Sequence, residues 1–187
     1  MGAEADEMDG LVSVLERHFE LAVLGAEIQC GDQQVLSIKS EMNLGVLEWL
    51  KNSEEYAYDL LLDVTAVDYG RGNKFQVVYQ LWSIQKKKLL RIKCPLAEEK
   101  LEIDSVTSLW GSANWLEREV FDLFGVQFVG HPDLRRILMP KNYSEGHPLR
   151  KDFPLRGRYS REKQTEIALD QSYEDYYRPE QLRGVDD

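Results

Sequence analysis

Two near-copies of one short motif carry the residues best suited to chemistry. Each begins with a Gly-His-Pro turn, at Gly130 and at Gly146, and continues with a leucine and paired cations. His131, His147 and Asp133 offer the nitrogen and oxygen ligands that transition metals accept. A proline nevertheless restricts the histidine before it to extended or turn geometry, and nothing supplies the close ligand pair of a stable site. We expect histidines that lock turns or pair with partner carboxylates, and no metal; a small metal-dependent enzyme using His131 and His147 is the alternative of another class.

Charged residues also share one face of a helix predicted over residues 112–124. Glu119 and Asp122 are three residues apart, and Arg118 and Asp122 are four apart, so their side chains are neighbours on the helix. Two carboxylates beside an arginine have the groups for acid–base chemistry. Ion pairs at these spacings are common on helix surfaces, and no nucleophile or cofactor motif accompanies them. We expect a surface polar patch and no catalytic residue.

Cofactor-binding motifs are absent from the sequence. Cys30 and Cys94 are too few for a four-thiolate iron–sulfur cluster or a structural zinc, and we expect both to be buried thiols. The glycine pair at residues 70–72 is too short for a nucleotide-binding loop and falls within a predicted hairpin. The prediction is therefore no cofactor in this chain.

The composition is that of a folded protein without a membrane span. Of 187 residues, 43% are hydrophobic and 30% are charged, and no apolar run approaches the length of about 20 residues that a bilayer requires. The acidic start resembles neither a secretory signal nor a mitochondrial presequence, so we expect prokaryotic, cytosolic residence. The net charge of −10 is uneven: residues 126–164 carry nine Lys and Arg against four Asp and Glu. The acidic remainder and the lack of a recognisable motif argue against a nucleic-acid partner.

Hydrophobic periodicity predicts an α+β fold, a two-layer domain in which helices pack on a mostly antiparallel sheet. Helices are predicted from an Asp9 cap to Gly25, from an Asn43 cap, and from a Ser112 cap to Phe124 with Gly125 ending it, and one more is possible at residues 161–169. Strands are predicted as a hairpin, 26–30 with 34–39, and as a three-stranded meander, 59–68, 74–84 and 89–94.

The last third of the chain has a different character. We divide the sequence into a core domain, residues 1–125, and an extended arm and tail, residues 126–187. Prolines punctuate the arm, which cannot bury enough apolar surface to offset the roughly 1–2 kcal/mol per residue that ordering costs. Its aromatic side chains, leucines and arginines are nevertheless the types that anchor interfaces. The pattern predicts an arm that lies across another subunit.

Residues 117–138 and 146–154 resemble the C subunit of the proton-pumping NADH:quinone oxidoreductase, respiratory complex I. Weaker similarity extends upstream through residues 62–68 and 75–79, and the segment 141–144 departs from the family in being basic or neutral. Related membrane-bound hydrogenases and ferredoxin-fed complexes use similar subunits and remain the alternative.

The resemblance implies a non-catalytic scaffold subunit in the peripheral arm, on the cytoplasmic side of the bacterial inner membrane. It implies that FMN and the iron–sulfur clusters lie in partner subunits and that this chain binds none of them. Its partners would be the quinone-site D subunit and neighbouring iron–sulfur subunits, with membrane association only through partners. The resemblance assigns interface or turn-locking roles to Glu117, Arg118, Glu119, Asp122, His131, Asp133, Arg135, Arg136, His147, Arg150, Lys151 and Asp152.

Overall fold

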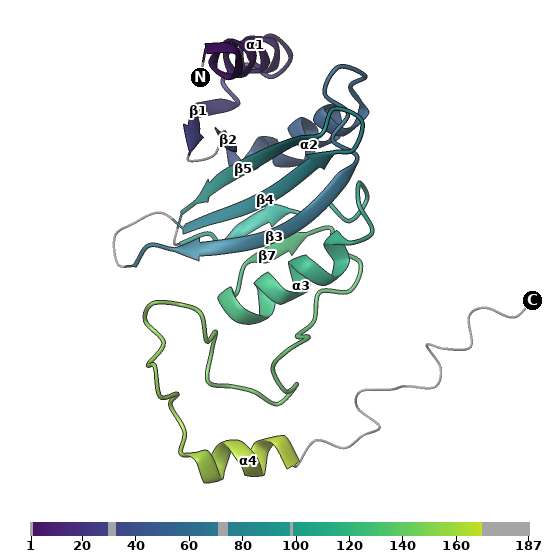
Figure 1. Cartoon of the computed structure of the whole chain (residues 1–187). Helices are drawn as coiled ribbons and strands as arrows, with labels where there is room; N and C mark the ends of the chain where they lie inside the picture. Colours follow the sequence, from purple (N-terminus) through teal and green to yellow (C-terminus); the bar gives the residue numbers. More distant parts are fainter. Residues whose placement is uncertain (1, 30–32, 71–74, 98, 170–187) are drawn as a thin grey trace, which may run out of the picture.

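The computed structural model describes residues 2–29, 33–70, 75–97 and 99–169, and its architecture is α+β, as predicted (Figure 1). The helices are α1 (Gly2–His18), the 3-10 turn η1 (Ser40–Met42), α2 (Asn43–Asn52), α3 (Ala113–Phe124) and α4 (Arg161–Leu169). The strands are β1 (Val23–Gln29), β2 (Gln33–Ile38), β3 (Leu60–Asp68), β4 (Phe75–Ser83), β5 (Lys88–Leu96), β6 (Glu102–Asp104) and β7 (Gln127–Val129).

The main sheet has five strands in the order β1-β2-β5-β4-β3. The predicted hairpin and meander are both present, and their strands pair antiparallel. β2 and β5 pair parallel, which joins the hairpin to the meander, and this contact was not predicted. A second small sheet, β6 with β7, is also parallel and was missed. β7 follows the predicted domain boundary at residue 125 and pairs with a strand that precedes it.

The core lies on one face of the main sheet. Side chains alternate along β4, where Phe75, Val77, Tyr79 and Leu81 are buried and the residues between them are half-buried. This period of two is the pattern from which the strand was predicted. The helices α1, α2 and α3 all contribute apolar side chains to the same buried cluster.

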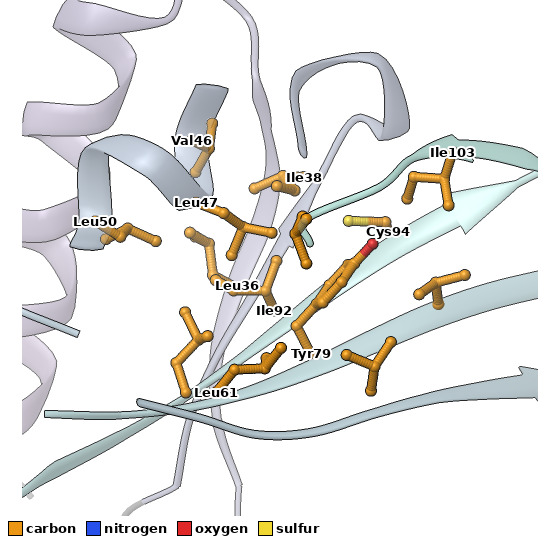
Figure 2. Packing of buried hydrophobic residues seen from close by; sticks show 14 of the residues in the cluster. Leu36, Ile38, Val46, Leu47, Leu50, Leu61, Tyr79, Ile92, Cys94 and Ile103 are labelled. Atoms are coloured by element: carbon orange, nitrogen blue, oxygen red, sulfur yellow. The ribbon is translucent and has the colours of Figure 1, made fainter. Parts of the chain in front are cut away.

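The α2 side chains fill the middle of this cluster. Figure 2 shows Val46, Leu47 and Leu50 beside Leu36 and Ile38 of β2, and all five are fully buried. Burying a side chain of this size contributes about 1.5–3 kcal/mol. The packing of α2 against β2 therefore helps to keep the β1–β2 hairpin in place beside the meander of β3, β4 and β5.

The predicted ends of the first helix were wrong. α1 begins before Asp9 and ends at His18, and Gly25 lies in β1. Leu21 adopts a left-handed conformation, φ 58°, and turns the chain toward β1. The prediction extended the helix too far because Ala22 follows the helical spacing of the apolar residues. Ala22 lies beyond the turn but is also buried in the core.

Asn43 does not cap α2, contrary to prediction. The residue before the helix is Met42, and η1 precedes it, so Asn43 is already helical. Its side chain enters the core, where Nδ2 donates to the Asp104 carbonyl oxygen at 2.8 Å and to the Tyr79 hydroxyl at 3.3 Å. Asn43 thus ties α2 to β4 and β6.

The predicted third and fourth helices are confirmed in α3 and α4, and Cys94 is a buried thiol as expected. Burial raises the pKa of Cys94. Cys30 lies outside the described residues. None of the helices that the structure describes is long and apolar enough to cross a bilayer. Beyond β7 the chain passes below α3 in Figure 1 and reaches α4 without further strands among the described residues.

Candidate partner-binding site

The helix α3 positions the first residues of the motif at 117–138. Val120 and Phe124 are buried, and the Phe124 ring meets the Phe75 ring of β4 edge-on at 5.8 Å. The helix ends at Gly125, φ 78°, as predicted, whereas Ser112 precedes it without a side-chain capping hydrogen bond. The apolar stripe fixes the orientation of the helix and so the direction of its polar side chains.

Asp122 is the centre of the site. Its carboxylate is fully buried and accepts four hydrogen bonds from the arm. Oδ2 accepts the backbone N–H groups of Ile137 at 3.0 Å, Leu138 at 2.7 Å and Met139 at 2.7 Å, and Oδ1 accepts Arg136 Nη1 at 2.8 Å. Consecutive N–H groups that converge on one oxygen form a backbone anion site, here filled by the protein's own carboxylate. We call Asp122 with residues 136–139 the Asp122 clasp.

The expectation of a surface polar patch was therefore wrong for Asp122 and for Arg118, which are both buried. The ion-pair partner of Asp122 is Arg136, fourteen residues later, and not Arg118 one turn before it. Arg136 Nη2 also donates to the Gly146 carbonyl oxygen, and its guanidinium lies 5.5 Å from the Tyr143 ring centre. The same arginine consequently links the first half of the arm to the second His-Pro turn.

The second His-Pro turn closes over the end of α3. His147 Nδ1 lies 2.9 Å from the Asp122 carbonyl oxygen, and Arg150 Nε donates to the Phe124 carbonyl oxygen. Burial lowers the pKa of His147, and the charges of Arg150 and Arg136 lower it further. A Cβ at Gly125 would stand 2.5 Å from His147 Nε2, so only glycine fits below this turn. His147 and Arg150 thus bind carbonyl groups that have no hydrogen-bond partner within the helix at its C-terminal end.

The first His-Pro turn packs beside the start of α3. His131 Nδ1 accepts the Asp133 backbone N–H at 3.0 Å, and Nε2 lies 3.1 Å from the Asn114 carbonyl oxygen. Asp133 pairs with Arg135 at 2.9 Å. Each histidine thus uses ring nitrogens on backbone groups, and the described residues contain no group of three His, Cys, Asp or Glu able to hold a metal.

Glu117 is also internal. It is fully buried, Oε2 accepts the Ser105 hydroxyl at 2.6 Å, and Oε1 accepts the Val106 backbone N–H at 2.7 Å. Burial raises its pKa to about 7, although both hydrogen bonds favour the charged form. Glu117 holds the turn after β6 against α3, while Glu119 on the same helix is exposed.

One buried residue of the arm was missed. Glu145 is almost completely buried, and its Oε2 accepts the backbone N–H groups of Arg158 at 2.6 Å and Tyr159 at 3.2 Å. The only sequence signal was an acidic residue directly before a Gly-His-Pro turn, in a segment otherwise basic or neutral. Glu145 thus holds residues 158–159 close to the second turn.

Three other motif residues face outward. Arg135, Lys151 and Asp152 are exposed, although the Lys151 backbone N–H donates to Asp68 Oδ2 at 2.8 Å and so tethers the arm to the end of β3. Several large apolar side chains of the arm are also exposed. They are Leu138, Leu149, Leu155 and Tyr159. The arm is thus fixed from within by polar groups and presents leucines and cations outward.

Comparison with known sequences identifies relatives over most of the chain. A family model described as the 30 kDa subunit of the respiratory-chain NADH dehydrogenase matches residues 36–159. The NADH-quinone oxidoreductase C subunit of Trichlorobacter lovleyi is 52% identical over 148 residues, 78% of this chain and 89% of that protein. The corresponding protein of Geotalea uraniireducens is 45% identical over 156 residues, 83% of this chain and 93% of its own length.

Two solved structures have a similar fold. The trypsin-resistant fragment of Nqo5 is 31% identical, with a TM-score of 0.54, and the match covers 66% of this chain and 98% of the fragment. One polypeptide of the membrane-bound sulfane sulfur reductase, an archaeal respiratory membrane complex, has a TM-score of 0.66 over 80% of this chain and 86% of its own length. At 22% identity, the second likeness concerns the fold alone.

Proposed function

The chain belongs to the family of the 30 kDa subunit of the respiratory-chain NADH dehydrogenase, and we propose that it serves as a structural subunit that binds no redox cofactor. In this proposal, FMN and iron–sulfur clusters in partner subunits carry electrons from NADH to quinone, and the complex couples this transfer to proton translocation. The chain contributes the surfaces that hold those partners in place.

The single observation that carries the structural role is the Asp122 clasp. A catalytic carboxylate must be free to exchange a proton or bind a ligand. The Asp122 carboxylate instead receives four donors from the protein itself, and the ring nitrogens of His131 and His147 contact backbone groups. The polar residues that looked most capable of chemistry are therefore engaged in shaping the arm.

The outward side of the arm supports a role in assembly. Leu155 is fully exposed, and the basic arm belongs to a chain with a net charge of −10. We propose that the arm binds the quinone-site D subunit and the neighbouring iron–sulfur subunits, on the cytoplasmic side of the inner membrane. Attachment to the membrane would then be peripheral and through these partners.

Assembly tests the proposal directly. In cells that lack the native gene, the Leu155→Asp variant should enter the membrane complex far less than the wild-type chain, because an added carboxylate opposes burial of this position. Ile84→Asp, at an exposed apolar residue in the turn between β4 and β5, is the matched control and should assemble normally. Normal yield of the complex with Leu155→Asp, or flavin or iron bound to the purified chain, would contradict the proposal.

A further inference from the structure

Among the residues that the structure describes, none covers most of the Trp115 side chain. Trp115 lies in the first half of α3, and 61% of its surface is accessible. Tryptophan carries one of the largest apolar surfaces of any side chain and is enriched at the centres of protein interfaces. Its ring is held in place by the Arg118 guanidinium, whose central carbon lies 5.2 Å from the ring centre. The indole therefore lies against a guanidinium and keeps most of its surface open to solvent.

Arg118 is a buried cation, and the described part of the chain gives it no carboxylate partner. Only 7% of the residue is accessible, and Nε and Nη2 donate to the carbonyl oxygens of Arg135 and Arg136 at 3.2 and 3.4 Å. The two nearby aspartates are engaged elsewhere, Asp122 with Arg136 and Asp133 with Arg135. Among the described residues no carboxylate lies within ion-pairing distance of Arg118.

The charges around this point do not balance. Three arginines and two aspartates leave one positive charge, and it belongs to the most buried of the three arginines. Burial lowers the pKa of Arg118, and repulsion from Arg135 lowers it further, while the charges of Asp133 and Asp122 offset only part of this shift. A buried charge is usually compensated by an opposite charge, because carbonyl dipoles offset only part of its lost hydration. A guanidinium also has five N–H donors, and the two carbonyl contacts of Arg118 use two of them.

We propose that Trp115 and Arg118 form a docking site for an acidic segment of another subunit, in which a carboxylate binds Arg118 and an apolar side chain covers the Trp115 ring. The inference rests on the proposed function, because it requires that the chain works within a multisubunit complex. It names a second contact, on α3, separate from the outward side of the arm.

Competition within the assembled complex tests the proposal. Wild-type and variant chains with different tags are co-expressed, and their ratio in the purified complex is measured by mass spectrometry. Trp115→Ala should be under-represented by roughly 30-fold, the effect of losing an interface anchor worth about 2 kcal/mol. Trp115→Phe should recover much of the incorporation, and Ile84→Ala, which removes a similarly exposed apolar side chain, should compete equally. Equal incorporation of Trp115→Ala would overturn the proposal.

The chemistry of the partner is tested by photo-crosslinking. Benzoylphenylalanine at position 115 of the full-length chain, in the assembled complex, should crosslink a peptide of another subunit in which Asp and Glu outnumber Lys and Arg. Crosslinks only to a second copy of this chain, only to neutral or basic peptides, or none at all, would overturn it. The same reagent at position 155 tests the arm, so a crosslink there without one at 115 refutes this site and leaves the proposed function intact. A wild-type chain that enters no complex refutes the proposed function itself.

Discussion

Asp122→Asn should release the arm while leaving the core folded. The substitution keeps the size of the side chain but removes the negative charge that accepts three backbone N–H groups and the Arg136 guanidinium. An asparagine oxygen retains part of this acceptance, and its NH2 group faces donors that it cannot bind. Arg136 is left near the helix without its counter-charge.

The free-energy cost of this substitution follows from the burial of the Asp122–Arg136 ion pair. Asp122 is fully buried and Arg136 is largely so, and removing one partner of a buried ion pair costs about 3–5 kcal/mol. The contacts of Val120 and Phe124 with the core do not involve the carboxylate. The cost should therefore appear as local opening of residues 136–150 and not as unfolding of the sheet.

Amide hydrogen exchange measures this opening residue by residue. The Ile137, Leu138 and Met139 amides should exchange about 100-fold faster or more, since each 1.36 kcal/mol is a factor of ten. The amides of β4 should keep their wild-type exchange rates. The control variant Glu119→Gln replaces an exposed carboxylate of the same helix by an amide, and it should change the exchange rates neither of residues 137–139 nor of β4. Unchanged exchange at Ile137–Met139 would refute the clasp, and equal acceleration in β4 would show that Asp122 stabilises the core instead.

Three further predictions concern the neighbouring groups. Because burial raises the pKa of Glu117 from 4.5 to about 7, the free energy of unfolding should fall by about 3 kcal/mol as pH rises from 4.5 to 7, and urea denaturation of Glu117→Gln should lack this slope. The pKa of His147 is lowered, so its contribution has the opposite sign: wild-type stability should decline as pH falls below about 6.5, and His147→Gln should lose that component in a thermal melt series from pH 5 to 8. Gly125→Ala should destabilise the chain by about 2–4 kcal/mol, through its positive φ and the contact with His147, whereas Gly111→Ala, where a Cβ meets open space, should change little. A flat difference between variant and wild type across pH, or equal melting temperatures for the two glycine variants, would contradict these assignments.

The strands were predictable because their signal is local. Buried and half-buried residues alternate along residues 75–83, and a short connection leads to the next strand at residue 88. These local features predict an antiparallel meander, whichever other strands pair with it. The parallel pairing of β2 with β5 leaves no comparable mark, since a strand carries the same apolar pattern whichever strand becomes its neighbour. The sequence therefore predicted the elements better than their order in the sheet.

The sequence predicted most residues of the site, but not Glu145 and not the contacts that these residues make with one another. Asp122 and Arg118 have the spacing of a surface ion pair, and a buried carboxylate looks the same in sequence as an exposed one. Asp122 differs only in its apolar neighbours, Phe121 and Leu123, and its partner Arg136 lies in a segment without periodicity. The sequence around Glu145 gives still less indication that this residue is buried. Its carboxylate binds the backbone N–H of Arg158, thirteen residues later, where the chain returns to it.

The order of strands also has a consequence for synthesis on the ribosome. β5 occupies the middle of the sheet but is synthesised after β1, β2, β3 and β4. The pairing of β2 can be completed only after the 58 residues that follow Ile38, up to Leu96, have been made. At about 5–20 residues per second, that interval lasts roughly 3–12 s. During it the β1–β2 hairpin presents an unpaired strand edge that carries Val35, Leu36 and Ile38, the state in which nascent chains associate wrongly. Slower translation upstream of β5 should therefore lower the soluble yield of this chain.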